Sequence, residues 1–180
     1  MPKQDLIPQL ATVFRTYGYE GATVARFSET TGLSKASLYY HFPNGKEEMA
    51  KEVLDYLNQR LLSALAELHQ KGAPLERLRR LCERLNDFYH QGQFACLLAL
   101  FSLGEASTLF QGQIQTALKT WIDAIAQVLT ESEFSDEEAH SRAQQAVLQI
   151  QGALVLARGL SDARIFEQVL NELPKALLRR

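Results

Sequence analysis

Apolar residues recur every three or four positions along almost the whole chain, which is the spacing of one face of an α-helix. The clearest run is Met49, Val53, Leu57, Leu61 and Leu65, which forms an apolar stripe at steps of four residues. No stretch shows the strict apolar–polar alternation of a half-buried strand, and no internal repeat is visible. The pattern therefore predicts an all-α protein with about nine helices.

Glycine, proline and helix-capping residues divide this pattern into segments. Gly18 ends the first run, Gly32 separates two short ones, and Pro43-Asn44-Gly45 precedes the longest. The expected helices span residues 6–17, 24–31, 35–40, 46–70, 75–88, 94–103, 114–129 and 136–158, and a last helix follows Ser161.

The composition fits a helical protein with a real core, because 46% of the 180 residues are hydrophobic. No run of 18 apolar residues occurs, and the N-terminal residues carry no cleavage signature, so we expect neither a membrane span nor secretion. Cys82 and Cys96 lie in apolar helical segments, which favours buried thiols in a reducing cytoplasm over a disulfide.

The two short helices over 24–31 and 35–40 have the size and turn residues of a helix-turn-helix, in which the second helix enters the DNA major groove. Gly32-Leu33-Ser34 supplies the turn and the cap. Taken alone, the adjacent tyrosines at 39 and 40 fit equally well as a cap over a core. The glycine turn, the serine cap, the short helix and the breaker at Pro43 together favour DNA binding.

The charge distribution agrees with this interpretation only weakly. The net charge of the chain is −2, but residues 1–46 carry five lysines and arginines against three acids. A local basic surface can bind phosphate whatever the net charge is. We therefore expect a DNA-binding domain at 1–46 and a larger helical domain at 47–180.

Hydroxyl, ammonium and imidazole groups on the second short helix suit contacts with phosphates and base edges. Ser34, Ser37 and Lys35 lie at its start, and Tyr39, Tyr40 and His41 follow. Lys46 begins the next helix, where free N–H groups and the helix dipole attract a phosphate. Its alternative role is that of a solvated lysine beside Glu47 and Glu48.

The stretch GATVARFSETTGLSKASLYYHFPNGKEEMA resembles the DNA-binding domain of the tetracycline-repressor (TetR) family of bacterial regulators, over about residues 5–55. Gly45 lengthens the loop before Lys46 in a way that is similar to the LmrA/YxaF-like subgroup. The resemblance implies a three-helix reader followed by a larger ligand-binding and dimerisation domain. It also implies that DNA is faced by Thr23, Lys35, Ser37, Tyr39, Tyr40, His41 and Lys46.

The C-terminal stretch GALVLARGLSDARIFEQVL resembles the last two helices of that family, which form a four-helix bundle between two subunits. Apolar stripes on both segments suit close helix packing, although a monomer could bury them internally. The expected interface residues are Ile150, Ala153, Leu154, Ala157, Ile165, Phe166, Val169 and Leu170. A two-fold dimer would place its readers ~34 Å or slightly more apart and would bind a pseudo-palindromic operator.

The helices between these two regions carry many aromatic residues and no cluster of lysines or arginines, which indicates an apolar or aromatic small-molecule effector. Asn86, His90, Gln151 and Cys96 are possible polar members, although such residues more often have a structural role. The candidate ligand-binding residues are Phe88, Phe94, Phe101, Trp121 and Gln151.

Enzyme motifs are absent from the sequence: it has no H-E-x-x-H, nucleophile elbow, phosphate loop or paired metal ligands, and we expect no cofactor and no metal. The sequence predicts a ligand-responsive transcriptional regulator, a dimeric repressor that binds double-stranded DNA and is released by a small apolar effector. The alternative is a dimeric helical ligand-binding or interaction module without DNA binding.

Overall fold

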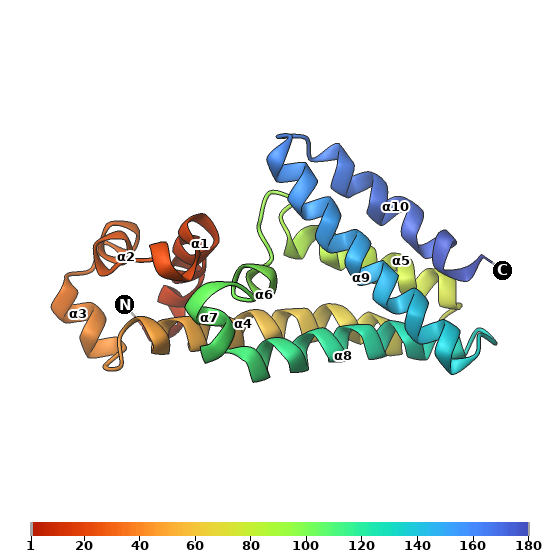
Figure 1. The fold of residues 1–180 in the computed structure, drawn as a ribbon, viewed down its shortest axis with the longest axis horizontal. Coiled ribbons are helices and arrows are strands. Elements are labelled where there is room, and N and C mark those ends of the chain that lie inside the picture. The colour runs from red at the N-terminus through yellow and green to blue at the C-terminus, as the bar shows by residue number, and fades with distance from the viewer. Residues whose placement is uncertain (1, 180) are drawn as a thin grey trace. The chain divides into compact units, whose positions relative to one another are not determined.

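A computed structural model describes residues 2–179, and these residues are folded as ten α-helices and one short 3-10 turn (Figure 1). The prediction of an all-α fold is confirmed. No helix of the described residues is both long enough and apolar enough to cross a bilayer.

The helices follow the predicted segments closely, except at residues 94–103 and at the end of the segment 46–70, where α4 stops at Leu65 and a 3-10 turn follows. Their bounds are α1 Lys3–Gly21, α2 Val24–Thr31, α3 Lys35–His41, α4 Lys46–Leu65, the 3-10 turn Ala66–His69, α5 Pro74–Phe88, α6 Leu97–Leu100, α7 Gly104–Leu109, α8 Gln111–Thr130, α9 Asp136–Gly159 and α10 Arg164–Leu178.

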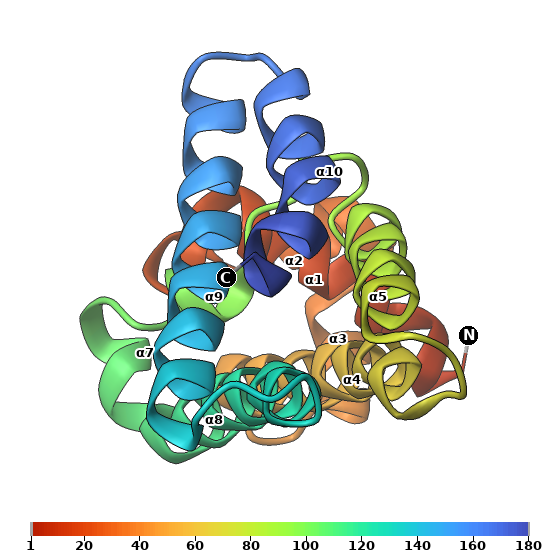
Figure 2. The ribbon, with the colours of Figure 1, turned by 90° about the vertical axis from the view of Figure 1, so that its right-hand side faces the viewer.

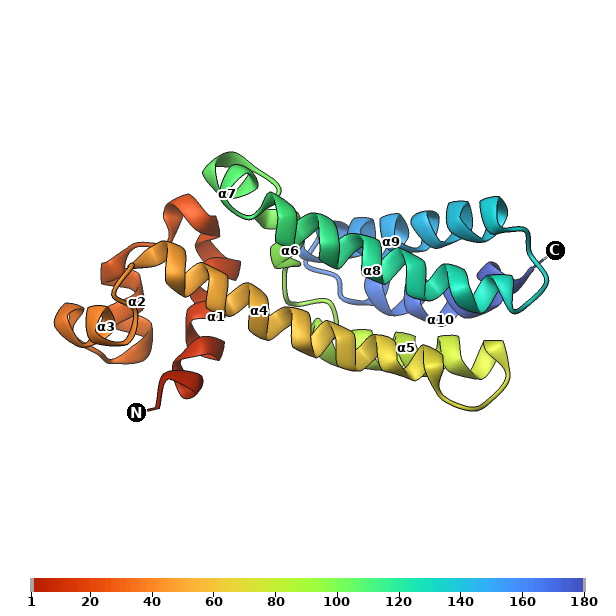
Figure 3. The same cartoon turned by 90° about the horizontal axis from the view of Figure 1, so that it is seen from below.

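The expected helix at 94–103 was wrong in its bounds, because only Leu97–Leu100 is helical there and a second short helix, α7, precedes α8 (Figure 3). Gly104 separates the two with a left-handed φ of +59°. Gly18 does interrupt the first helix, as expected: its φ of 68° and ψ of −177° form a kink, after which one more turn continues to Gly21.

The chain divides into two compact units. Unit 1 contains Met1–Gln59 and Leu97–Gln115, and unit 2 contains Arg60–Cys96 and Thr116–Arg180. The short helices α6 and α7 therefore belong with the first three helices, although they lie far along the sequence. The functional boundary expected after residue 46 stays a prediction.

Aromatic rings form the core of unit 1 around Phe14. Its ring centroid lies 5.2 Å from that of Phe27 in α2 and 5.4 Å from that of Phe101. Tyr19 also lies 5.7 Å from both Phe101 and Phe110. Edge-to-face packing of this kind stabilises beyond the area it buries, so α6 and α7 are fixed against α1.

Unit 2 is built around a hairpin of α9 and α10, and α5 lies beside α10 (Figure 2). The small residues Ala139, Ala143, Ala146 and Ala153 on α9 are buried, which allows close packing of the helices. The largely buried Arg77 of α5 donates to the carbonyl of Leu68 at 2.9 Å and pairs with Glu131 at 2.5 Å. It thereby ties together the 3-10 turn, α5 and the end of α8.

Candidate nucleic-acid interface

The turn between α2 and α3 is fixed by three local contacts. Thr23 caps α2 by accepting from the N–H of Arg26 at 3.4 Å. Gly32 ends α2 with a left-handed φ of 70° and donates its N–H to Ser28 O. Ser34 then caps α3 by accepting from the N–H of Ser37 at 3.1 Å. The helix-turn-helix follows from these capping preferences.

Helix α3 is short because Pro43 follows its C-cap, Phe42. One side of it carries Leu38 and leads to Phe42, and both side chains are completely buried. The other side carries Tyr39, which is 40% exposed, and Tyr40, which is 83% exposed. The buried side holds the helix in unit 1, and the exposed side is left for a partner.

The serines at the start of α3 keep one hydroxyl proton for an external acceptor. Ser34 Oγ and Ser37 Oγ lie 3.0 Å apart, so one hydroxyl donates to the other. Ser34 Oγ also accepts the capping N–H, which leaves the second hydroxyl proton of the pair directed outside it. Such a group can donate to a phosphate oxygen.

Tyr39 has Lys35 and Gly45 as neighbours. The ammonium of Lys35 lies 5.9 Å from its ring centroid. A Cβ added to Gly45 would stand 3.4 Å from Tyr39 Cε1, an ordinary van der Waals contact, so glycine is favoured there by its left-handed φ of +67°. The rings of Tyr40 and His41 are 5.5 Å apart in an edge-to-face arrangement.

At the start of α4, the acidic neighbours of Lys46 differ in their contacts. Glu48 accepts from the N–H of Asn44 at 2.9 Å and pairs with Lys3 at 3.1 Å, so its charge is neutralised within the chain. These contacts, the Asn44 N–H first, hold the pKa of Glu48 below its usual range. Glu47 is exposed and has no such partner in the described part of the chain.

The ammonium of Lys46 lies over the ring of Tyr19, a contact that the sequence did not indicate. The ammonium lies 4.1 Å from the ring centroid of Tyr19, within cation–π range. Burial, followed by the negative charges of Glu105, Glu47 and Glu20, raises the pKa of Tyr19 to about 12. Lys46 is half-buried and takes part in no ion pair among the residues that the structure describes.

All eight predicted DNA-contact residues lie in unit 1, on α3, at its cap, at the α2 cap or at the start of α4. Their contact with DNA stays a prediction. No local pattern indicates the roles of Lys3 and Tyr19, because their partners are far away along the chain. Lys3 pairs with Glu48 and Glu52 across 45 and 49 residues.

Most of the predicted interface residues lie inside the single chain. Six of them are buried in unit 2, where they pack within the chain: Ile150, Ala153, Leu154, Ala157, Phe166 and Leu170. Ile165 and Val169 on α10 are half-buried. The outer face of α9 instead exposes Leu148, Val155, Leu156 and Leu160, each by more than half.

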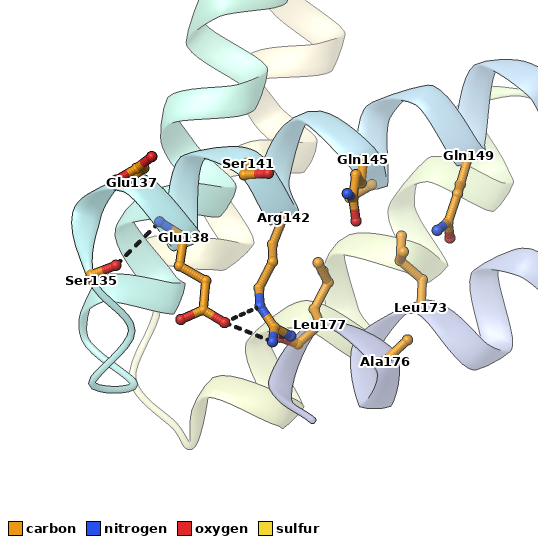
Figure 4. A pocket seen from close by; sticks show the side chains of 11 residues that line it. Ser135, Glu137, Glu138, Ser141, Arg142, Gln145, Gln149, Leu173, Ala176 and Leu177 are labelled. Carbon is orange, nitrogen blue, oxygen red and sulfur yellow. Dashed lines mark hydrogen bonds and ion pairs between the residues drawn. The ribbon is translucent and has the colours of Figure 1, made fainter. Parts of the chain in front are cut away.

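A groove of about 640 Å³ runs between the first half of α9 and the end of α10 (Figure 4). The polar residues Ser141, Gln145 and Gln149 line its α9 side, while Leu173 and Leu177 of α10 lie opposite. Arg142 pairs with Glu138 at 2.8 Å and donates to the carbonyls of Leu177 and Arg179, and so connects α9 with the end of α10.

The predicted ligand-binding residues are divided between the units. Phe101 belongs to the aromatic core of unit 1, whereas Phe88, Phe94, Trp121 and Gln151 belong to unit 2. In unit 2, Trp121 Nε1 and Gln151 Nε2 are buried donors without a protein acceptor in the described residues. Asn86 Oδ1 is a buried acceptor without a donor there.

Neither cysteine has the surroundings of a reactive thiol. Cys82 and Cys96 are free and buried. Burial, and then the charge of Glu83, raises the pKa of Cys82 to about 12, which keeps the thiol protonated at neutral pH. No group of three or more His, Cys, Asp or Glu side chains among the described residues is placed to hold a metal ion.

Comparison with known proteins identifies both parts of the chain. The C-terminal domain model of LmrA/YxaF-like transcriptional regulators matches residues 74–172, and the model of bacterial regulatory proteins of the tetR family matches residues 9–53. The HTH-type transcriptional regulator YxaF of Bacillus subtilis (strain 168) is 21% identical over 177 residues, which cover 96% of this chain and 93% of YxaF.

Two further relatives support the same assignment. The biofilm operon negative transcriptional regulator IcaR of Staphylococcus aureus is 39% identical over 59 residues, 31% of this chain and 32% of IcaR. The crystal structure of a TetR transcriptional regulator from Legionella pneumophila shares the fold, with a TM-score of 0.84 at 20% identity over 98% of this chain and 97% of that one.

These matches cover the helix-turn-helix and more than half of the chain beyond it. The family consists of transcriptional regulators and not of enzymes, as the absence of catalytic motifs in the sequence predicted. The chain belongs to the TetR family of bacterial helix-turn-helix transcriptional regulators, and its C-terminal domain is of the LmrA/YxaF-like type.

Proposed function

We propose that this regulator is a dimeric repressor that binds a pseudo-palindromic operator and is released by a small, largely apolar effector. The observation that carries the proposal is the two-sided α3, whose one side is fully buried while Tyr40 is 83% exposed on the other. A large aromatic side chain held out from a rigid helix has no role in the chain's own packing.

The exposed side of α3 supplies base and backbone contacts, and the start of α4 supplies a phosphate site. The N–H groups of Lys46 and Glu47 begin a helix of 20 residues and donate to no carbonyl outside it in the described residues. The Lys46 ammonium is close by, and Glu48 is already neutralised by Lys3. A helix start with a lysine in this arrangement suits a phosphate.

Dimerisation through the outer face of α9 follows from its exposed apolar residues. Leu148, Val155, Leu156 and Leu160 lie around Gly152, which leaves space for a second helix. The helix begins with Asp136, Glu137 and Glu138 and carries Arg158 in its last turn. Two copies packed antiparallel around a two-fold axis would bring opposite charges together.

An effector site in unit 2 would account for its buried polar atoms without partners. Trp121 Nε1 and Gln151 Nε2 each lack an acceptor among residues 2–179, and a buried donor without an acceptor costs about 1–3 kcal/mol. An apolar ligand that carries a carbonyl or hydroxyl oxygen would satisfy such donors. Trp121 is the only tryptophan, so its fluorescence reports directly on ligand binding at that side chain.

Repression, and not activation, is proposed from the relatives and from the mechanism. IcaR, which is 39% identical to this chain over 59 residues, is named as a negative regulator. A ligand that favours a state with mismatched reader spacing releases the operator, and the coupling is reciprocal, so operator DNA weakens ligand binding by the same factor. Equal effector affinity with and without operator would exclude this mechanism.

The test is a fluorescence-anisotropy titration against DNA from immediately upstream of the protein's own gene, with a scrambled duplex as control, at several salt concentrations. Saturable, sequence-selective binding by two subunits per site is expected. Weak and equal binding to both duplexes, unchanged in a Tyr39→Ala/Tyr40→Ala variant, would favour a helical interaction module that does not read DNA.

A further inference from the structure

Glu20, near the end of α1, contacts the backbone of α7. Its carboxylate accepts from the N–H of Glu105 at 2.7 Å, across 85 residues of sequence. Gly104 makes this contact possible, because a Cβ at that position would stand 2.1 Å from Glu20 Oε1. The φ of Gly104 is +59°, so a larger residue would be unfavourable there for its backbone as well.

The same carboxylate lies near the lysine that we assign to phosphate. Glu20 follows Tyr19, whose ring holds the Lys46 ammonium at 4.1 Å. The pKa of Glu20 is held below its usual range by its own backbone N–H first, then by the Glu105 N–H and by the positive charge of Lys46. Glu20 is therefore an anion at neutral pH, and it forms no ion pair with Lys46 among the described contacts.

Residues 97–110 also hold the Tyr19 side of this arrangement. The rings of Phe101 and Phe110 each lie 5.7 Å from the Tyr19 ring. These residues and Gly104 fall within the stretch that matches the C-terminal domain of LmrA/YxaF-like regulators, yet they pack in unit 1. This part of the sequence thus supplies the groups that fix both Tyr19 and Glu20.

We propose that Glu20 is a positioning residue for DNA binding: the backbone of α7 holds its carboxylate away from Lys46, and release from α7 lets it pair with Lys46 and withdraw that ammonium from phosphate. This role rests on the proposed contact between Lys46 and DNA. Helix α8 begins directly after the C-terminal end of α7 and continues into unit 2, so a shift of α8 would displace α7 from that end.

Glu20 and Lys46 each have two alternative partners. The Glu20 carboxylate binds either the backbone of α7 or Lys46, and the Lys46 ammonium binds either a phosphate or Glu20. With α7 in place, Glu20 is satisfied by backbone donors, and Lys46 is free to leave the Tyr19 ring for a phosphate. With α7 withdrawn, Glu20 loses the N–H donor of Glu105, while the positive charge of Lys46 still acts on its carboxylate. A lysine that is paired with a carboxylate no longer contacts a phosphate, so it releases no counterion when DNA binds. The slope of log K against log [salt] then falls by about 1.

The test measures binding of a fluorescein-labelled duplex of arbitrary sequence as a function of salt, since phosphate contacts do not depend on sequence. Gly104→Ala displaces Glu20 from α7 and is expected to lower the salt slope by about 1, to the value of Lys46→Ala. Adding Glu20→Gln to Gly104→Ala removes the competing charge and is expected to restore the wild-type slope. A purely structural defect would not be rescued in this way.

A second pair of variants covers the case in which Gly104→Ala does not fold. Glu105→Pro removes the N–H that holds Glu20 at a position in the first turn of α7, where proline is tolerated. Glu105→Ala retains the N–H and removes the same charge. The proline variant is expected to lower the salt slope by about 1 relative to the alanine variant, and Glu20→Gln is expected to restore it.

The outcomes separate the two proposals. If Lys46→Ala lowers the slope but Gly104→Ala and Glu105→Pro do not, Glu20 has no positioning role and the phosphate contact stands. A lowered slope that Glu20→Gln fails to restore also overturns the role of Glu20. If Lys46→Ala itself leaves the wild-type slope unchanged, Lys46 touches no phosphate, and both assignments are wrong.

Discussion

Two positions on the short helix α3, Leu38 and Tyr40, are expected to separate stability from DNA binding. Tyr40 is 83% exposed, so Tyr40→Ala is expected to change the free energy of unfolding by no more than about 0.5 kcal/mol. Leu38 is fully buried, and Leu38→Ala is expected to cost about 2–5 kcal/mol. Denaturant titration of both variants measures this difference.

Relative to the stability that each variant loses, DNA affinity is expected to fall more in Tyr40→Ala than in Leu38→Ala. If Tyr40 contacts DNA as proposed, Tyr40→Ala weakens operator binding several-fold while the protein stays fully folded. If Tyr40→Ala binds DNA as the wild type does, the exposed side of α3 is not the reading surface.

Lys46 is expected to act through its charge alone. Lys46→Ala should weaken binding to all DNA sequences alike and lower the salt slope by about 1. Lys51 is a matched control on the same helix, because it already pairs with Asp55 at 2.7 Å. Lys51→Ala is expected to leave the slope unchanged. An effect of Lys46→Ala that depended strongly on base sequence would show that its role is base recognition.

Residue roles that depend on near neighbours in the sequence were predictable, and roles that depend on distant residues were not. The cap residues Thr23 and Ser34 could be predicted, because capping depends on neighbours within three residues. The Lys3–Glu48 pair and the Glu20–Glu105 contact span 45 and 85 residues. No spacing rule reaches that far, so only the fold reveals them.

At the level of the helices, the α2–α3 turn depends on the left-handed backbone of Gly32. An added Cβ would meet nothing within 4 Å, so Gly32→Ala changes only the backbone energy and is expected to cost about 1–2 kcal/mol. Gly112 in α8 has equally open space but no left-handed φ. Gly112→Ala is expected to stabilise by about 0.5 kcal/mol.

Thermal unfolding at one fixed protein concentration compares the two alanine variants. The changes in the free energy of unfolding are expected to have opposite signs, a loss for Gly32→Ala and a gain for Gly112→Ala. A destabilisation of similar size in both would mean that crowding, and not the left-handed turn, determines the cost at Gly32.

Helix positions were predictable where breakers occur, and uncertain where apolar residues continue. The run from Phe94 to Leu103 contained no signal for the end of α6 at Leu100 or for α7. A continuous apolar run has no alternation with polar residues from which a helix end could be predicted. The same limit affected α9. Its small apolar residues suited either a partner or the chain itself, and the structure buries Ala153 and Ala157 internally.

For the whole molecule, the outer face of α9 is expected to hold the dimer together. Val155 is 65% exposed, so Val155→Glu should leave the subunit folded and shift the mass in sedimentation equilibrium to that of a monomer. Thr116→Glu on α8 introduces the same charge at another exposed position of unit 2 and should stay dimeric. Dimers of unchanged stability in both variants would exclude this face.

The fold class and the DNA-reading helices followed from the sequence because capping and periodicity are local properties. The packing of residues 97–115 with the reading helices did not, because it depends on aromatic contacts between distant segments such as Tyr19 and Phe101. The effector is the least predictable part, since a pocket is defined by shape and not by a sequence pattern.

Selection of bound sequences from a pool of random DNA duplexes reveals whether a dimer of this protein reads DNA through α3. A dimer that reads DNA through α3 is expected to enrich an inverted repeat whose half-sites are separated by about one helical turn, ~34 Å, or slightly more. The Tyr40→Ala variant should enrich it weakly or not at all. A pool that remains random under wild-type selection, at low salt and with folded dimer, would contradict the account.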